Sequence, residues 1–179
     1  DLIRRAKRKG MHVTASVNPM NLYFTDEILS EFETNYKVFP PIREESDRKA
    51  LIAGLKDGTI DMIETHHTPQ DTECKNLEFA YADYGVTMLE TAFSVIQMAV
   101  ENELTTAEII EKIAINPRQI LNLELPTIET GSIANFTIFA PETTWTYSKS
   151  KSKSKNSPFL GKELKGKVLG IVNNGKWRF

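Results

Sequence analysis

The chain has 179 residues, a formal net charge of −2 and 26% charged residues, which is an ordinary composition for a soluble globular protein. A net charge of −2 does not favour binding to nucleic acid or to anionic membranes. The apolar runs are too short to cross a bilayer. No secretory signal peptide is visible and Cys74 is the single cysteine, so we expect a reducing, cytoplasmic setting.

The first third of the chain begins as a helix and then turns extended. Residues 1–10 place charges on one face of a helix and apolar side chains on the other. Because the sequence opens inside this helix, we expect it to be a piece of a longer protein. Residues 11–17 include the β-branched Val13, Thr14 and Val17 and predict a strand. Residues 27–32 predict a short helix capped by Thr25 or Asp26.

The next stretch has the order of a parallel α/β sheet or barrel. A long loop is followed by a helix that Ser46 or Asp47 is expected to cap, and residues 60–65 then predict a buried strand. His66 and His67 follow at the carboxyl end of that strand, where parallel α/β proteins gather their working residues.

A helical region follows these strands. Residues 83–103 predict a turn and then an apolar helix. Thr105 and Glu108 match a capping box at the start of another helix. We expect Asn116 and Pro117 to break that helix and residues 117–123 to make one or two more helical turns.

The C-terminal part changes to β-structure. Residues 130–141 predict a turn and a strand, and residues 166–179 predict a hairpin that turns at Asn173, Asn174 and Gly175. Between them, residues 148–155 alternate serine and lysine and predict a solvated, mobile loop. The alternative is a strip that binds phosphate or an acidic partner, which the lack of interleaved aromatic residues disfavours.

Polar residues follow each of the two predicted parallel strands. They are Asn18 and Asn21 after the first strand, and His66, His67, Gln70, Asp71 and Glu73 after the second. Adjacent strand residues point to opposite faces and a zinc site needs three or four ligands, so the histidine pair alone indicates a metal only weakly. The alternative is two loop histidines that are hydrogen-bonded to carbonyls or carboxylates. Cys74 has no base at a recognisable spacing, which predicts a solvated thiol rather than a nucleophile.

Four stretches in order, GMHVTASVNPMNL, NYKVFPPIREESDRKALIAGLKDGTIDMIETHHTPQ, YGVTMLETAF and NSPFLGKELKGKV, resemble the second half of a dihydroorotase. Dihydroorotases are cyclic amidohydrolases of the metal-dependent amidohydrolase superfamily. The resemblance implies an α/β fold, the C-terminal portion of a (β/α)8 barrel plus part of a small β-domain. Residues 1–125 would hold the last two β/α units and C-terminal helices, and residues 126–179 the β-domain segment with its Ser/Lys-rich loop.

The family's motifs imply which residues should carry the chemistry, and several of those differ here. In D-H-A-P-H, the Asp is the metal-associated base and the last His contacts substrate; this chain has His66 and Gln70 there. The substrate-contacting Asn of K-x-N-P-P-L-R is Phe39, whereas the Gly of a pocket-lining Phe-Gly remains as Gly85. The Glu and both histidines of E-V-T-P-H-H-L are replaced by Ser16, Met20 and Asn21.

The resemblance implies the family reaction, the reversible hydrolysis of dihydroorotate to N-carbamoyl-aspartate in pyrimidine biosynthesis, with zinc as the cofactor. Because the base and the substrate contacts are replaced, we expect a pseudoenzyme that is retained for assembly and binds no zinc through this chain. The alternative is an active zinc-dependent amidohydrolase that uses His66 as a metal ligand or base. Expected partners are a second copy, the missing N-terminal half, aspartate transcarbamoylase or an active dihydroorotase.

Overall fold

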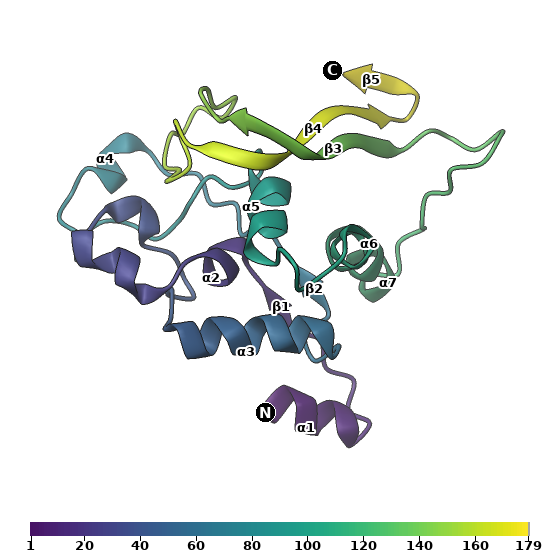
Figure 1. The fold of residues 1–179 in the computed structure, drawn as a ribbon, viewed down its shortest axis with the longest axis horizontal. Helices are drawn as coiled ribbons and strands as arrows, with labels where there is room; N and C mark the ends of the chain where they lie inside the picture. Colours follow the sequence, from purple (N-terminus) through teal and green to yellow (C-terminus); the bar gives the residue numbers. More distant parts are fainter. Residues whose placement is uncertain (179) are drawn as a thin grey trace.

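A computed structural model describes residues 1–178 as a mixed α/β fold with two separate groups of strands joined by helices (Figure 1). The first group is a parallel pair, β1 (Ser16–Val17) and β2 (Met62–Ile63), with Ser16 opposite Met62 and Val17 opposite Ile63. Strands are predicted at both places, but each ladder is only two residues long. His12, expected within the first strand, therefore lies in exposed chain before it.

Short helices surround the parallel pair. The helices are α1 (Leu2–Arg8), α2 (Pro19–Tyr23), α3 (Glu45–Lys56), α4 (Thr72–Lys75), α5 (Ala92–Ala99), α6 (Thr106–Ile110) and α7 (Asn116–Ile120), with the 3₁₀ turns η1 (Asp26–Glu31) and η2 (Thr34–Tyr36). None of the helices in residues 1–178 has the length and hydropathy needed to span a membrane.

The helix starts test the capping predictions. Glu44 is the N-cap of α3, so Ser46 and Asp47 are not caps; both lie in the first turn, where the Asp47 carboxylate favours the helix dipole. The capping box at α6 is confirmed, because Thr105 and Glu108 exchange side-chain and backbone hydrogen bonds.

The expected helix break at Asn116 and Pro117 is wrong. The helix continues through a turn of π-helix, η3 (Glu111–Ile115), directly into α7, whose first turn contains Pro117. Proline is tolerated in the first turn of a helix, where its missing N–H has no intrahelical acceptor. The wider π turn allows the chain to restart a helix there without interruption.

The second group of strands is an antiparallel sheet in the order β3 (Phe136–Thr146), β4 (Glu163–Asn173) and β5 (Lys176–Arg178). The predicted C-terminal hairpin is confirmed. Asn174 and Gly175 form its two-residue turn, with φ of 49° and 72°. Positive φ at both central residues is the pattern of a type I′ turn, which matches the twist of the strands it joins.

One core joins the parallel pair to the antiparallel sheet. Helix α5 packs against β4 on one side and α2 on the other (Figure 1). The fully buried side chains of this core include Met20, Leu22, Leu55, Met88, Val95, Ile96, Ile109 and Leu164. The predicted boundary between residues 125 and 126 falls in the stretch between α7 and β3, and the division into two domains stays a prediction.

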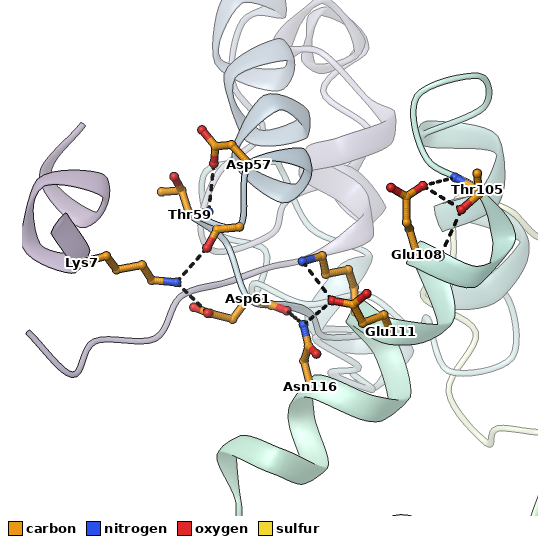
Figure 2. A network of polar contacts seen from close by, with 10 residues as sticks. Lys7, Asp57, Thr59, Asp61, Thr105, Glu108, Glu111 and Asn116 are labelled. Carbon is orange, nitrogen blue, oxygen red and sulfur yellow. Dashed lines mark hydrogen bonds and ion pairs between the residues drawn. The ribbon is translucent and has the colours of Figure 1, made fainter. Parts of the chain in front are cut away.

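A polar network fixes the amino end of β2 (Figure 2). Lys7 of α1 donates to Asp61 Oδ1 at 2.6 Å, and the Ala15 N–H donates to Asp61 Oδ2 at 2.8 Å. Asn116 Nδ2 donates to the Asp61 carbonyl at 2.8 Å. These bonds join α1, the chain before β1 and α7 at the end of β2 opposite to His66. In barrels this end supplies stability, and the carboxyl end supplies function.

The alternating Ser/Lys run is held by the rest of the molecule. Ser150 is buried, Ser152 and Ser154 are half-buried, and the lysines between them are exposed. We call residues 148–157 the strap. The expectation of a solvated loop is wrong for Ser150, Ser152 and Ser154, whereas Ser148 and the lysine side chains are exposed. The mobility of the loop stays a prediction.

Candidate functional site

A small cleft of about 80 Å³ opens at the carboxyl ends of β1 and β2. Its lining comes from the chain after β1, the loop before Pro40, the loop after β2 and the segment that follows α4. The lining residues are Asn18, Met20, Val38, Phe39, His66, Thr68, Tyr84, Gly85 and Val86. Of the family's base and substrate-pocket positions, the fold therefore brings together His66, Phe39 and Gly85 but not Gln70.

His66 lies in the cleft and has a left-handed backbone, with φ of 47°. Its Nδ1 is 3.9 Å from Glu64 Oε1, and that oxygen accepts a 2.9 Å hydrogen bond from the Ser16 hydroxyl. Non-glycine residues rarely adopt positive φ, and they concentrate at sites where the surrounding structure holds them. Because of this left-handed backbone, the His66 side chain points in a different direction from the side chain of a residue in a regular strand.

His67 is used for structure rather than for the cleft. Its Nδ1 accepts hydrogen bonds from the backbone N–H groups of Met88 at 3.1 Å and Leu89 at 3.2 Å. An acceptor nitrogen carries no proton, so any proton of this ring is on Nε2. His67 also forms an isolated parallel bridge with Val86. His67 is therefore a hydrogen-bonded loop histidine, but its partners are backbone N–H donors and not the expected carbonyls or carboxylates.

Aromatic rings form the lip of the cleft. Phe39 and Tyr84 meet edge to face with ring centroids 5.9 Å apart, and Phe39 is 64% exposed. The ammonium of Lys37 lies 4.8 Å from the centroid of the Tyr84 ring, within the range of a cation–π contact. The position where the resemblance places an amide is therefore an exposed hydrocarbon ring.

Gly85 is the place in the cleft wall where the backbone passes close to Thr68. Its φ is 137°, and a Cβ there would lie 2.8 Å from the carbonyl oxygen of Thr68. The Gly85 N–H donates to the Lys37 carbonyl at 3.0 Å, and its own carbonyl accepts from Lys75 Nζ at 3.1 Å. Burial lowers the pKa of Lys75 to about 8. Only glycine fits this backbone and this space.

Gln70 does not line the cleft. Its side-chain Nε2 donates to the Tyr84 carbonyl at 2.8 Å, and its backbone N–H donates to Asn156 Oδ1 at 3.2 Å. Asp71 and Glu73 lie at the start of α4 and also stay outside the lining. Cys74 is half-buried, and a hydrogen bond with Asp83 raises the pKa of its thiol, which disfavours the nucleophilic thiolate.

Asn156 was not predicted as a site residue, yet it holds the cleft loops together. It is 4% exposed. Its Nδ2 donates to the Thr68 carbonyl at 3.0 Å, and its backbone carbonyl accepts from the Thr87 N–H at 2.8 Å. The sequence signal that could have identified Asn156 was its position at the junction of the Ser/Lys run with the apolar Pro158-Phe159.

Asn18 and Asn21, the two candidates after β1, mainly shape the start of α2. Asn18 Oδ1 accepts from the Asn21 N–H at 3.1 Å as the helix N-cap. Asn21 Nδ2 donates to the Pro41 carbonyl at 2.7 Å. Asn18 lines the cleft, whereas Asn21 lines a wider groove beside it.

The donors of the cleft do not fit a zinc site on their own. Within residues 1–178, no three histidine, cysteine or carboxylate side chains are grouped so that they could hold a metal ion. His66 and Glu64 offer two donors, one fewer than the protein ligands of a catalytic zinc and two fewer than those of a structural zinc.

Comparison with known proteins gives one consistent family. The model of the amidohydrolase family matches residues 1–178. The chain is 42% identical over 178 residues to the dihydroorotase of Clostridioides difficile and 40% identical to that of Syntrophus aciditrophicus, in both cases over 98% of this chain and 42% of the relative. The chain thus spans about two fifths of the length of these relatives.

Solved structures agree with the predicted fold class. The L-hydantoinase (dihydropyrimidinase) of Arthrobacter aurescens superposes on 98% of this chain and 41% of its own with a TM-score of 0.88 at 23% identity. An inactive dihydroorotase-like domain of a Chaetomium thermophilum multifunctional protein covers 98% of this chain and 46% of its own at a TM-score of 0.71 and 21% identity. The prediction of an α/β fold that forms part of an amidohydrolase barrel is confirmed. The chain belongs to the amidohydrolase family.

Proposed function

We propose that this chain is the C-terminal part of a dihydroorotase-like protein that does not hydrolyse dihydroorotate and whose fold is kept for assembly. One observation carries the proposal. The cleft gathers the positions at which the resemblance puts the base, a substrate contact and a motif histidine, and it presents His66, Phe39 and Met20 there.

The substitutions change the chemistry that the cleft can perform. A carboxylate base accepts a proton and also balances the charge of nearby cations, whereas the imidazole of His66 brings no negative charge. Phe39 neither donates nor accepts a hydrogen bond, and its ring occupies the lip of the cleft. Loss of a general base alone costs ~10²–10⁴ in rate, and loss of substrate contacts adds to that cost.

The relatives support this assignment in two ways. The curated relatives are named dihydroorotases, which favours dihydroorotate as the ancestral substrate class. The Chaetomium thermophilum domain is described as inactive and dihydroorotase-like, so a fold of this kind can be kept in a protein without that activity.

The proposed role is in assembly in the cytoplasm. Candidate partners are the N-terminal part of the barrel, a second copy of the protein, aspartate transcarbamoylase or an active dihydroorotase. In this account, residues 1–125 supply barrel units and residues 126–179 supply part of the β-domain.

The alternative is a zinc-dependent amidohydrolase with a rewired site. His66 Nδ1 in the cleft lies 3.9 Å from Oε1 of Glu64, which lines the wider groove beside it, and further ligands from elsewhere in a full-length protein would complete a zinc site around this pair. His66 would then be a metal ligand or base.

Replacing His66 with alanine separates the two functions. The non-catalytic account expects the protein at its full natural length to show the same zinc content and the same background rate of dihydroorotate hydrolysis with and without His66→Ala. The rewired-site account expects both quantities to fall in the variant, the rate by at least about 100-fold. His12→Ala is the matched control, because His12 is exposed and does not line the cleft.

A further inference from the structure

We propose that the strap is a docking surface for an acidic segment of a partner protein, presented as a fixed row of lysines. This inference rests on the proposed role in assembly and names the surface and the chemistry of the partner. The sequence from Ser148 to Lys162 holds five lysines and no carboxylate, in a chain whose net charge is −2. Positive charge is therefore concentrated in this segment.

The Glu90 carboxylate fixes the backbone of the strap. It accepts hydrogen bonds from the Ser150 hydroxyl at 2.9 Å, from the Lys151 N–H at 3.0 Å and from the Ser152 N–H at 3.3 Å. The Tyr147 hydroxyl donates to the same carboxylate at 3.2 Å. The Glu90 carboxylate thus holds three consecutive strap residues and the Tyr147 hydroxyl that precedes them.

Hydrogen bonds within the strap engage one of its four lysines and leave the other three free. Lys155 Nζ turns back and donates to the carbonyls of Ser150 at 3.1 Å and Ser152 at 2.7 Å. The other three strap lysines are exposed, and within residues 1–178 their ammonium groups have no hydrogen bond or ion pair; they are Lys149, Lys151 and Lys153. The Glu90 carboxylate accepts hydrogen bonds from backbone N–H and hydroxyl groups, and within the described residues it forms no ion pair with these three lysines.

The residue types favour carboxylates over nucleic acid. The row contains only lysines, whose compact and strongly hydrated charge suits electrostatic contacts at the rim of an interface. Arginine, the residue best matched to bidentate phosphate contacts, is absent from the strap, and no aromatic side chain is present to stack on a base. An acidic peptide is therefore the partner chemistry that fits.

The carboxyl end of the strap contacts a loop that lines the cleft. Asn156, the penultimate residue of the strap, donates to the Thr68 carbonyl and accepts from the Gln70 N–H in the loop after β2. Thr68 lines the cleft, so the strap is joined directly to the cleft wall.

The test measures binding of a dye-labelled polyglutamate peptide to the protein at its full natural length, by fluorescence anisotropy. Wild type should bind at about 50 mM salt and lose affinity at about 300 mM. The triple variant Lys149→Gln, Lys151→Gln and Lys153→Gln should bind about tenfold more weakly. A control with the same charge change on other elements, Lys9→Gln, Lys49→Gln and Lys176→Gln, should lose less than about twofold.

Glu90→Gln distinguishes a fixed row from net charge alone. This variant makes the protein more positive, so diffuse attraction predicts tighter binding, whereas release of the strap predicts weaker binding by about threefold or more. Tighter binding by Glu90→Gln, equal losses in both triple variants or no wild-type binding would each overturn the proposal. So would stronger binding of an oligonucleotide or an anionic vesicle than of the peptide. Turnover of dihydroorotate, assayed on the same samples, would sink the proposed function separately and leave the peptide result interpretable.

Discussion

Replacing Gly85 with alanine is expected to lower the free energy of unfolding by about 3 kcal/mol. The new Cβ would lie 2.8 Å from the Thr68 carbonyl oxygen and 3.0 Å from the Thr68 Cβ, at a φ of 137° that side chains rarely adopt. The backbone has little room to yield, because the Gly85 N–H and carbonyl are bonded to Lys37 and Lys75. Denaturant unfolding of both proteins under identical conditions measures the difference.

Gly58→Ala is the matched control for this prediction. Gly58 also has positive φ, at 74°, but a Cβ there would meet no atom within 4 Å. The control should cost about 1 kcal/mol, which is the price of a left-handed alanine alone. If the two alanine variants are equally stable, the close approach of Gly85 to Thr68 does not constrain the cleft.

Replacing Asn156 with alanine is expected to cost about 3 kcal/mol of unfolding free energy. The change removes the donor to the Thr68 carbonyl and the acceptor of the Gln70 N–H, and it leaves a cavity at a site that is 4% exposed. Because the same residue connects the strap to the loop after β2, the variant should also raise amide hydrogen exchange at Thr68 and Gln70.

Asn76→Ala provides the comparison for Asn156. Asn76 is exposed and follows α4, so its replacement should change the unfolding free energy by less than about 0.5 kcal/mol. Unchanged hydrogen exchange at Thr68 and Gln70 in Asn156→Ala would show that other contacts hold the cleft loops.

Local signals in the sequence were sufficient for many of the elements. The capping box of Thr105 and Glu108 and the turn at Asn174 and Gly175 depend on neighbouring residues alone, and both are present. The cap of α3 was assigned two or three residues late, since Ser46 and Asp47 are also favourable in a first turn. Pro117 was wrongly predicted to break the helix, because no local sequence pattern reveals the π-helical turn that precedes it.

The site required contacts between distant parts of the chain. Strand alternation predicted that His66 and His67 would separate, but their roles depend on the positive φ of His66 and on the N–H groups of Met88 and Leu89, more than twenty residues away. The importance of Asn156 depends on a loop more than eighty residues earlier. Resemblance located the cleft positions, and it did not predict that Gln70 would turn away from the lining.

The most direct test of the central claim is elemental analysis combined with a dihydroorotate hydrolysis assay on the protein at its full natural length, purified without chelator. The account predicts no zinc bound in proportion to protein and no hydrolysis above the rate without protein. Zinc at about one or two ions per chain together with turnover of dihydroorotate would contradict it and would make His66 a working ligand or base.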